Sequence, residues 1–594
     1  MKYSDLIGDW LVESGYTHCF FVAGGGIMHL LDAFKSRFEC IPVVHECSAG
    51  IVSEHFNECS VAKEKAFALV TTGPGVTNIV TPIAGCFVEH RELLVIAGQV
   101  KSSDIHEFPE RQRGVQEIDG VSICKHITVD SVRIDNPISK NQFKALVNKS
   151  RHPHPGPIFI EICLDVQGRE CSKETICNKS KFPIHSRSEP KDKDIDFVNS
   201  LLKTSKRPLV LLGGLVSRQS SWSCIEKFEK LGLPIATTTS AIDRINTNSQ
   251  IFAGRPGTWG GQRAGNMILA QADLVIAIGA QLDLQQTGFN FEQFCPNALL
   301  VHIFPSDFEL KRRGPPAVRK INCNSDKWLI RMADWVTWKD NFEWVKYIKK
   351  ILNYLPSIEA CNSHNNKFIN AFQFLKNLSI ASDKTDILAL CSSGGTFTGA
   401  LQNYETKFKQ IATTSPAHAS MGYGLATAIG AAFANPKNRI ILTEGDGGFA
   451  QNLQELSVLK NANLNIKIFL IQNNGYGSIR ATQKKFFNGA YIGCDVQTRL
   501  SFPDWENLFA SYNIPCNSLD INENSPHKLK KLLEQSAGPE AWVVKVDPEQ
   551  TNWPALSTEI TKNGNMVTSP LYSMLPPLSD SVLKKVGKFL PQKS

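Results

Sequence analysis

The 594-residue sequence lacks the features that mark several classes of protein. Its 16 cysteines are scattered without a Cys-x-x-Cys pair, a distribution that disfavours a zinc site or a disulfide framework. No apolar run reaches the length of a membrane span. Asp5, Asp9 and Glu13 interrupt the apolar residues at the start of the chain, so the hydrophobic region of a signal peptide is missing as well. We therefore expect a cytoplasmic protein with reduced cysteines and no membrane partner.

The sequence also lacks a dense cluster of basic residues. The net charge is +8, and the densest local group is Lys311 to Arg313. Nucleic-acid binding needs clustered charge on a recognisable module, so we expect no nucleic-acid partner. A dispersed positive charge is typical of a solvated surface, and it also favours the approach of anionic substrates.

Strand-like apolar runs alternate with helical segments throughout the chain, and this rhythm is typical of parallel sheets with crossover helices. The length exceeds what a single core supports. We predict an α/β protein with three consecutive doubly wound parallel-sheet domains. The expected boundaries are 1–170, 190–345 and 365–560 for the domains and 561–594 for a carboxyl-terminal tail.

In the third block, the buried-strand run "RIILTEGDGG" ends in an aspartate between glycines. Asn473 ends the next strand-like run, 27 positions after Asp446. One β-α-β crossover spans that distance, so both side chains are expected at adjacent strand ends. Carboxylate and amide oxygens suit Mg²⁺ or Ca²⁺ carrying phosphates. Taken alone, "GDGG" is equally typical of an ordinary turn.

This segment resembles the GDG…NN signature of thiamine diphosphate enzymes. The resemblance implies that Asp446, Asn473 and the main-chain carbonyl of Gly475 hold the Mg²⁺ that bridges the two phosphates of the cofactor. It also implies that several further residues line the cofactor site. These are Gly395, Thr396, Gly445, Gly447, Gly448, Asn473 and Tyr476.

Three features of the first block match, in order, the pyrimidine domain of the acetolactate synthase-like enzymes. They are "VAGGG" with Gly25, "IPVVHECSAG" with Glu46, and "TTGPGVTN", which ends at Asn78. A lone Glu at such a place is usually a helix cap or a surface residue. The resemblance implies instead that Glu46 hydrogen-bonds the aminopyrimidine nitrogen N1′ of the cofactor. Met421 lies where the family has the wedge that bends the cofactor, although a Met there is often packing alone.

The residues that separate decarboxylases from carboligases in this superfamily favour a carboligase. Pyruvate decarboxylase supplies a His pair and a Glu that protonate the decarboxylated donor, and those positions are Val115, Gln116 and Ile479 here. Without a nearby acid, an acyl-anion unit is not protonated quickly and can react with a carbonyl acceptor. The segment "VQEIDGVSICKHI" instead resembles acetolactate synthase, which makes Gln116 a second expected catalytic residue.

The chain departs from true acetolactate synthase where the acceptor is chosen. Gln286 stands where the synthase has an Arg for the carboxylate of the acceptor, and Thr482 replaces a bulky Trp. We therefore expect a larger acceptor pocket that has no cation to bind the carboxylate of an acceptor. The stretch "DLQQTG" and the tail look closest to carboligases of branched-sugar biosynthesis. We expect a 2-keto acid donor, taken as pyruvate, and a carbonyl acceptor that includes nucleotide-linked keto sugars.

Three questions stay open at the level of sequence. FAD binding is one, because the chain keeps "GGL" at Gly213 but has His154 and Phe304 where the family has an Arg and an acid. Another is whether the family's homodimer, with its site between chains, assembles further into a homotetramer. The third is the activity itself, for which the alternatives are a non-ligating 2-keto acid decarboxylase, a C–C lyase and a non-catalytic cofactor-binding paralogue.

Overall fold

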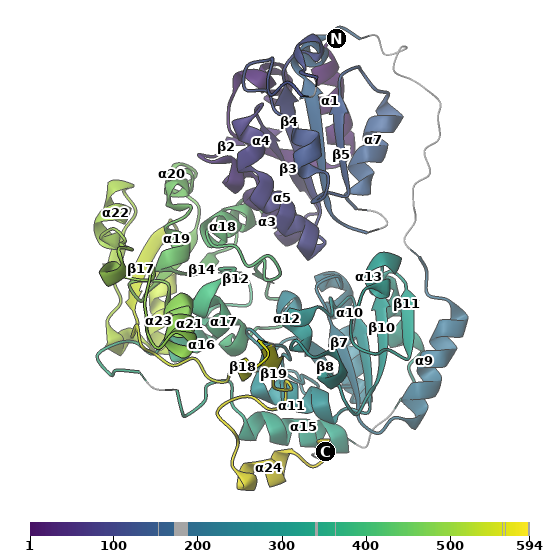
Figure 1. Cartoon of the computed structure of the whole chain (residues 1–594), viewed down its shortest axis with the longest axis vertical. Helices are drawn as coiled ribbons and strands as arrows, with labels where there is room; N and C mark the ends of the chain where they lie inside the picture. Colours follow the sequence, from purple (N-terminus) through teal and green to yellow (C-terminus); the bar gives the residue numbers. More distant parts are fainter. Residues whose placement is uncertain are drawn as a thin grey trace.

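The computed structural model describes residues 1–107, 109–151, 154–171, 188–338, 342–362, 364–560, 562–564 and 566–591. Three parallel sheets, each covered by helices, follow one another along the chain (Figure 1). The predicted fold class is therefore confirmed. Within the described ranges, no helix has both the length and the apolar character needed to cross a bilayer.

The first sheet has the strand order β2-β1-β3-β4-β6-β5, all parallel. Its elements are α1 (Tyr3–Glu13), β1 (Tyr16–Phe21), α2 (Met28–Phe34), β2 (Glu39–Pro42), α3 (Glu46–Cys59), β3 (Lys65–Val70), α4 (Pro74–Asn78), α5 (Val80–Glu89), β4 (Leu93–Gln99), α6 (Gly120–Cys124), β5 (Asp130–Ile134), α7 (Lys140–Lys149), β6 (Pro157–Cys163) and α8 (Leu164–Gly168).

The third sheet, with order β13-β12-β14-β15-β17-β16, repeats the topology of the first sheet strand for strand. Its elements are α16 (Ala371–Ala381), β12 (Ile387–Leu390), α17 (Gly394–Asn403), β13 (Ala412–Thr413), α18 (Tyr423–Ala434), β14 (Ile440–Gly445), α19 (Asp446–Phe449), the 3-10 turn η5 (Leu453–Glu455), α20 (Leu456–Asn461), β15 (Ile466–Gln472), α21 (Gly477–Phe486), α22 (Trp505–Ser511), β16 (Cys516–Ser518), α23 (Pro526–Glu534) and β17 (Glu540–Lys545). In both sheets the chain reverses its winding between the first and third strands, and ligands of open α/β sheets bind at such a switch point.

The central sheet has the order β11-β10-β9-β7-β8. Its elements are α9 (Asp192–Thr204), β7 (Pro208–Leu212), α10 (Arg218–Leu231), β8 (Ile235–Thr237), α11 (Arg263–Gln271), β9 (Leu274–Ile278), α12 (Leu284–Thr287), β10 (Leu299–Phe304), α13 (Asp307–Lys311), β11 (Arg319–Asn322), α14 (Ser325–Trp335) and α15 (Glu343–Tyr354). The tail, with β18 (Thr558–Ile560), β19 (Met566–Thr568) and α24 (Asp580–Val586), folds back onto this domain. Arg263 donates to the Met574 carbonyl at 2.8 Å, and Gln271 donates to the Val586 carbonyl at 2.9 Å.

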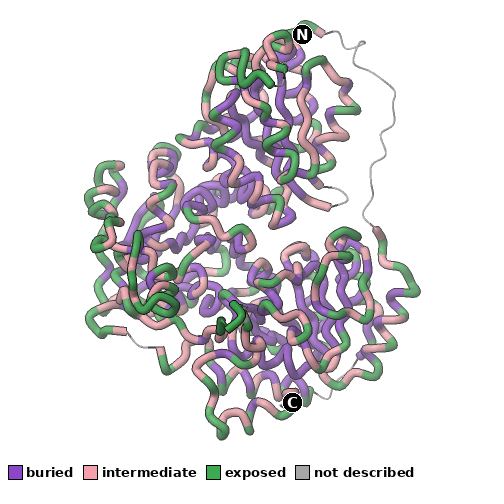
Figure 2. Tube along the Cα trace, viewed as in Figure 1, coloured by how far each residue is buried: buried purple, intermediate pink, exposed green. Residues whose placement is uncertain are grey.

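The first and third domains share one hydrophobic core, which is centred on the packing of α3 against α18. Gly430 of α18 makes this packing possible, because a Cβ atom there would overlap the Val52 carbonyl of α3. Figure 2 shows the buried strands and these helices in the interior, with exposed residues on loops and outer helices. Inner strands such as β4 and β9 are buried along their whole length because helices cover both faces of their sheets.

Candidate functional site

The carboxyl end of β14 carries a buried carboxylate. Asp446 is 1% exposed, and its oxygens accept hydrogen bonds from three backbone N–H groups, those of Gly447 at 2.8 Å, Asn473 at 3.0 Å and Asn474 at 2.7 Å. Burial raises the pKa of Asp446 to about 6, against the effect of these hydrogen bonds. No cationic side chain of the described residues pairs with it. A buried carboxylate with this surrounding is stabilised by a bound cation.

The neighbouring strand brings the amide of Asn473 to the same place. Gly445 and Ile471 are register partners of β14 and β15, so Asp446 and Asn473 leave adjacent strand ends. The Asn473 side-chain oxygen accepts the Gly475 N–H at 3.2 Å. The backbone at Gly475 passes so close to the Cys494 carbonyl that a Cβ atom would overlap it. The structure thus brings together the three predicted metal ligands, and their oxygen donors suit Mg²⁺.

The glycines of this site leave room beside the metal ligands. A Cβ atom at Gly395, in the first turn of α17, would meet nothing within 4 Å, whereas one at Gly445 would lie 3.4 Å from the Thr396 hydroxyl oxygen. The Tyr476 ring covers Gly447, where a Cβ atom would lie 2.5 Å from the ring. Figure 1 shows α17 and α21, which are in contact, at this end of the sheet. Both begin here, and helix N-termini favour the phosphates of a bound diphosphate.

Two further residues predicted for this half lie at its edge. A Cβ atom at Gly448 would lie 3.0 Å from a side-chain oxygen of the buried Glu444. Met421 precedes α18 and is 37% exposed, with its sulfur 3.7 Å from the Gln451 amide nitrogen. Asn452 donates to the Gly422 carbonyl at 2.7 Å and so fixes the turn that carries Met421.

The first domain presents the predicted Glu46 as the opening residue of α3. Glu46 is 8% exposed, and the Asn78 amide donates to its Oε2 atom at 3.0 Å. Gly25 lies at the switch point between β1 and β3, and a Cβ atom there would meet nothing within 4 Å. The orientation of the Glu46 carboxylate is therefore fixed by an amide.

Gln116 lies next to the glycine turn that follows β3. Gly73 has φ +69°, and a Cβ atom at this position would overlap the Gln116 carbonyl oxygen. Gln116 is exposed and itself has φ +59°. The next residue, Glu117, is buried and accepts hydrogen bonds from the backbone N–H groups of Arg113 and Gly114, both at 2.9 Å. Glu117 thus holds the turn that presents Gln116.

The sequence did not single out Glu117 or a second carboxylate, Glu455. Glu455 of η5 accepts the backbone N–H groups of Val44 at 3.2 Å and His45 at 3.0 Å, immediately before Glu46. It therefore fixes the start of α3 from the third domain. The sequence feature that could have indicated Glu117 is its position directly after Gln116 in "VQE". The contact of Glu455 joins residues 410 positions apart, which no local pattern reveals.

The structure keeps Glu46 and Asp446 on separate sheets. Among the described residues, no hydrogen bond joins Glu46 or Asn78 to the Asp446 group. Val115 and Ile479, at the positions where the sequence predicts that proton donors are missing, are 86% and 46% exposed. Gln286 is buried, and its amide donates to the Pro256 carbonyl at 2.7 Å, so its side chain is held within the central domain.

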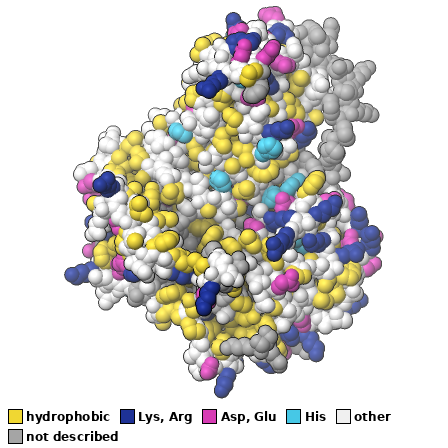
Figure 3. All heavy atoms as spheres, in the orientation of Figure 1, with side chains coloured by type: hydrophobic (Ala, Val, Ile, Leu, Met, Phe, Trp, Pro, Cys, Tyr) yellow, Lys and Arg dark blue, Asp and Glu magenta, His cyan; other side chains and the backbone are white. Residues whose placement is uncertain are grey.

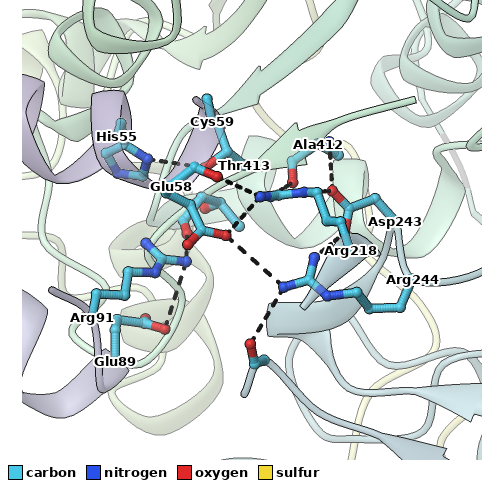
Figure 4. A network of polar contacts seen from close by, with 12 residues as sticks. His55, Glu58, Cys59, Glu89, Arg91, Arg218, Asp243, Arg244, Ala412 and Thr413 are labelled. Carbon is cyan, nitrogen blue, oxygen red and sulfur yellow. Dashed lines mark hydrogen bonds and ion pairs between the residues drawn. The ribbon is translucent and has the colours of Figure 1, made fainter. Parts of the chain in front are cut away.

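The three domains meet at a buried network of charged side chains, drawn in Figure 4. Arg218 of α10 donates to Asp243 at 2.5 Å in its own domain, to the Glu58 carbonyl at 2.6 Å in the first domain and to the Ala412 carbonyl at 3.0 Å in the third. Arg91 donates to Glu54 at 2.7 Å. These contacts fix the positions of the domains around the candidate site.

Glu89 of this network gives the stability of the protein a pH dependence. It accepts the Ala417 N–H at 2.5 Å, and burial raises its pKa from 4.5 to about 7. The folded state therefore keeps a proton that the unfolded state releases, and stability falls as pH rises from 4.5 to 7. We expect wild type to lose up to about 3 kcal/mol relative to Glu89→Gln over this window.

Thermal unfolding at several pH values between 4.5 and 8 tests this expectation. The melting temperature of Glu89→Gln should rise relative to wild type as pH increases. Glu170→Gln, which changes an exposed carboxylate in the same domain, serves as the matched control. A difference between wild type and Glu89→Gln that does not vary with pH contradicts the assignment.

Comparison with known families and proteins agrees with this geometry. Residues 1–123 match the "Thiamine pyrophosphate enzyme, N-terminal TPP binding domain", residues 195–324 match the central domain, and residues 393–545 match the C-terminal TPP binding domain. The chain is 26% identical over 563 residues to "Acetolactate synthase isozyme 1 large subunit" of Escherichia coli (strain K12), covering 93% of this chain and 95% of that protein. It is 27% identical over 544 residues to "Acetolactate synthase large subunit" of Lactococcus lactis subsp. lactis (strain IL1403), covering 89% and 90%.

Proposed function

We propose the function of this chain from one premise: it belongs to the thiamine diphosphate-dependent enzymes of the acetolactate synthase-like family. The proposed activity is a carboligation. The enzyme decarboxylates a 2-keto acid, pyruvate in the first instance, and transfers the acyl-anion unit to a carbonyl acceptor. When bound, thiamine diphosphate supplies the nucleophilic carbon and the electron sink for the decarboxylation.

The residues of the third domain fit the diphosphate end of the cofactor. Asp446, Asn473 and the carbonyl of Gly475 would hold Mg²⁺, because the buried Asp446 carboxylate has no cationic partner among the described residues and the other two residues lie beside it. The glycines around Gly395 and Gly445 leave space for the phosphates. The fit to a metal-bound diphosphate rests on the oxygen donors of these residues and on the open space beside the glycine backbone.

The residues of the first domain fit the ring end. Glu46 would hold a proton at N1′ of the aminopyrimidine, with Asn78 keeping its Oε2 atom in place. Gln116, presented by the turn that Glu117 supports, would contact the donor. Met421 would support the bent shape of the cofactor.

The observation that carries the ligase assignment is the apolar surface where a decarboxylase has acids. Val115 and Ile479 carry no acidic proton, so these side chains would not protonate an acyl-anion unit before a carbonyl compound reaches it. Gln286 carries no charge, and its amide donates a hydrogen bond to the Pro256 carbonyl. No cation is therefore present at that position for an acceptor that carries a carboxylate. We therefore favour a bulky ketone or aldehyde, and a nucleotide-linked keto sugar in particular.

Carbon-13 NMR with labelled pyruvate tests this function. Holoenzyme is incubated with and without aldehydes, keto acids and nucleotide-linked keto sugars, and label should appear joined to one acceptor class. Release of labelled acetaldehyde alone would instead support a non-ligating decarboxylase. Unchanged pyruvate would contradict the donor assignment.

FAD stays a proposal for the central domain, which departs from the family's pattern at two positions. β10 ends in the buried Phe304 in place of the acid expected there, and the His90 ring lies 5.5 Å from the ring centre of Phe304 and 4.4 Å from that of His154. The crevice beside Gly214 and Leu215 opens into a cavity of about 830 Å³, which Arg91, Arg218 and Arg244 also line. This space suits a large ligand, so the residues at Phe304 and His154 do not by themselves exclude FAD.

Removal of the metal carboxylate is expected to release the cofactor. In Asp446→Ala, the two phosphates would lose their metal clamp, and we expect thiamine diphosphate affinity to fall at least about tenfold. Equilibrium dialysis at a fixed Mg²⁺ concentration measures this affinity. The control is Asp504→Ala, which changes a helix-capping residue in the same domain. Wild-type occupancy in Asp446→Ala would overturn the metal assignment.

The family's arrangement also leads us to propose a homodimer as the minimum active unit, with a homotetramer as its larger form. The separation of Glu46 from Asp446 within one chain supports this assembly. The cytoplasmic location inferred from the sequence stays a prediction.

A further inference from the structure

Two large aromatic rings of the central domain are open to solvent. Trp259 is 54% and Phe289 is 48% exposed, and their ring centres lie 6.3 Å apart in a T-shaped arrangement. They come from two loops that are tied together, because the Thr258 N–H and hydroxyl both donate to the Gln285 carbonyl, at 3.2 and 2.7 Å. An exposed aromatic pair on a fixed backbone is typical of a binding surface.

The backbone is constrained to present these rings. Phe289 has φ +65°, a left-handed conformation that is costly for a bulky residue and that concentrates at functional sites. Beside Trp259, Gly260 has φ +77°, and a Cβ atom there would lie 2.6 Å from the Leu401 side chain of α17. The aromatic pair is therefore anchored beside the helix whose first turn belongs to the proposed cofactor site.

Basic side chains continue the same surface. The Arg313 guanidinium lies 5.9 Å from the ring centre of Phe291, and Gly314 lies beside the Leu282 carbonyl, so the segment after α13 adjoins the loop that carries Phe289. Arg312 pairs with Glu309 at 3.3 Å, whereas Lys311 and Arg313 have no carboxylate partner in the described part of the chain. Figure 3 shows Lys and Arg side chains gathered over α13.

We propose that Trp259, Phe289, Lys311, Arg312 and Arg313 form an acceptor rim that binds the sugar and diphosphate of a nucleoside diphosphate sugar. This inference rests on the proposed function, since it assigns the acceptor class to residues. The two rings pack against the apolar face of the sugar, and the cations pair with the diphosphate oxygens. The rings adjoin α17 through Gly260 and Leu401, and Arg313 adjoins the rings through Phe291. This order, rings and then cations, matches the order of sugar and diphosphate in such a ligand.

Calorimetric titration of the holoenzyme tests the acceptor rim. Saturating thiamine diphosphate and Mg²⁺ fill the cofactor site, and the probes are UDP, UDP-glucose and uridine. We expect UDP to bind at least about tenfold more tightly than uridine, and its Kd to increase with salt concentration. Arg312→Gln/Arg313→Gln should weaken UDP binding at least about tenfold, whereas Trp259→Leu should weaken UDP-glucose binding more than UDP binding.

The matched control is Lys346→Gln/Lys350→Gln, which removes the same charge from α15 and should bind UDP as wild type does. Equal UDP affinity in the Arg312→Gln/Arg313→Gln variant and in wild type would overturn the acceptor rim. If wild type joins pyruvate carbon to a small aldehyde but does not bind UDP, the rim is wrong and the carboligase function stands. If UDP binds through these arginines and no carbonyl compound receives pyruvate carbon, the rim stands and the carboligase function is wrong.

Discussion

Glu46→Gln is expected to lower kcat by about 10²- to 10⁴-fold while thiamine diphosphate stays bound, because a carboxamide cannot exchange the proton that we propose the carboxylate to hold at N1′. The pocket around it should persist. Gln has the size of Glu, and its side-chain oxygen still accepts the Asn78 amide hydrogen bond that now reaches Oε2 at 3.0 Å. The start of α3 is fixed independently by Glu455.

Two measurements on the same preparations decide this prediction. Steady-state consumption of pyruvate gives kcat, and equilibrium dialysis gives cofactor occupancy. Glu64→Gln, which changes an exposed Glu of the same domain, is the matched control and should retain wild-type values for both. Unchanged turnover in Glu46→Gln would remove Glu46 from the proton-transfer role, and lost cofactor with lost turnover would make it a binding residue instead.

The sequence predicted the fold because each level of the pattern points to the same structure. Runs such as "RIILTEG" and "IKIFLIQ" became β14 and β15, since strands buried on both faces must be apolar along their length. Glycines after these strands marked the carboxyl ends at which the predicted cofactor residues lie. The topology shared by the first and third sheets could not be predicted, because their strand runs carry no common sequence that reveals it.

The prediction of the site was limited by contacts between distant residues. Asp446 and Asn473 are separated by one crossover, so their meeting follows from chain geometry. Glu455 supports the residues before Glu46 across two domains, and Gly260 places Trp259 beside Leu401 of another domain. The sequence contains these residues without any local sign of their partners. The sequence shows the Lys311 to Arg313 cluster, but it does not show that exposed aromatic rings lie beside this cluster.

Mixing two inactive variants is expected to restore activity. If the site forms between chains, Glu46 of one subunit works with Asp446 of another, and a dimer of Glu46→Gln with Asp446→Ala has one site with both changes and one with neither. Random pairing of equal amounts makes half of the dimers mixed, so about a quarter of the wild-type sites reappear. Each variant alone has no intact site.

The experiment requires the subunits to exchange, so the two variants are unfolded and refolded together, or produced together with different affinity tags and purified through both. Doubly purified mixed dimers should then have about half of the wild-type activity, since one of their two sites is intact. Mixing Glu46→Gln with Gln116→Ala is the control, because both changes lie in the first domain and no pairing brings an unchanged first domain to either site. Activity that fails to recover in the first mixture would place Glu46 and Asp446 in the same chain's site, which requires a movement that brings together residues now held on separate sheets.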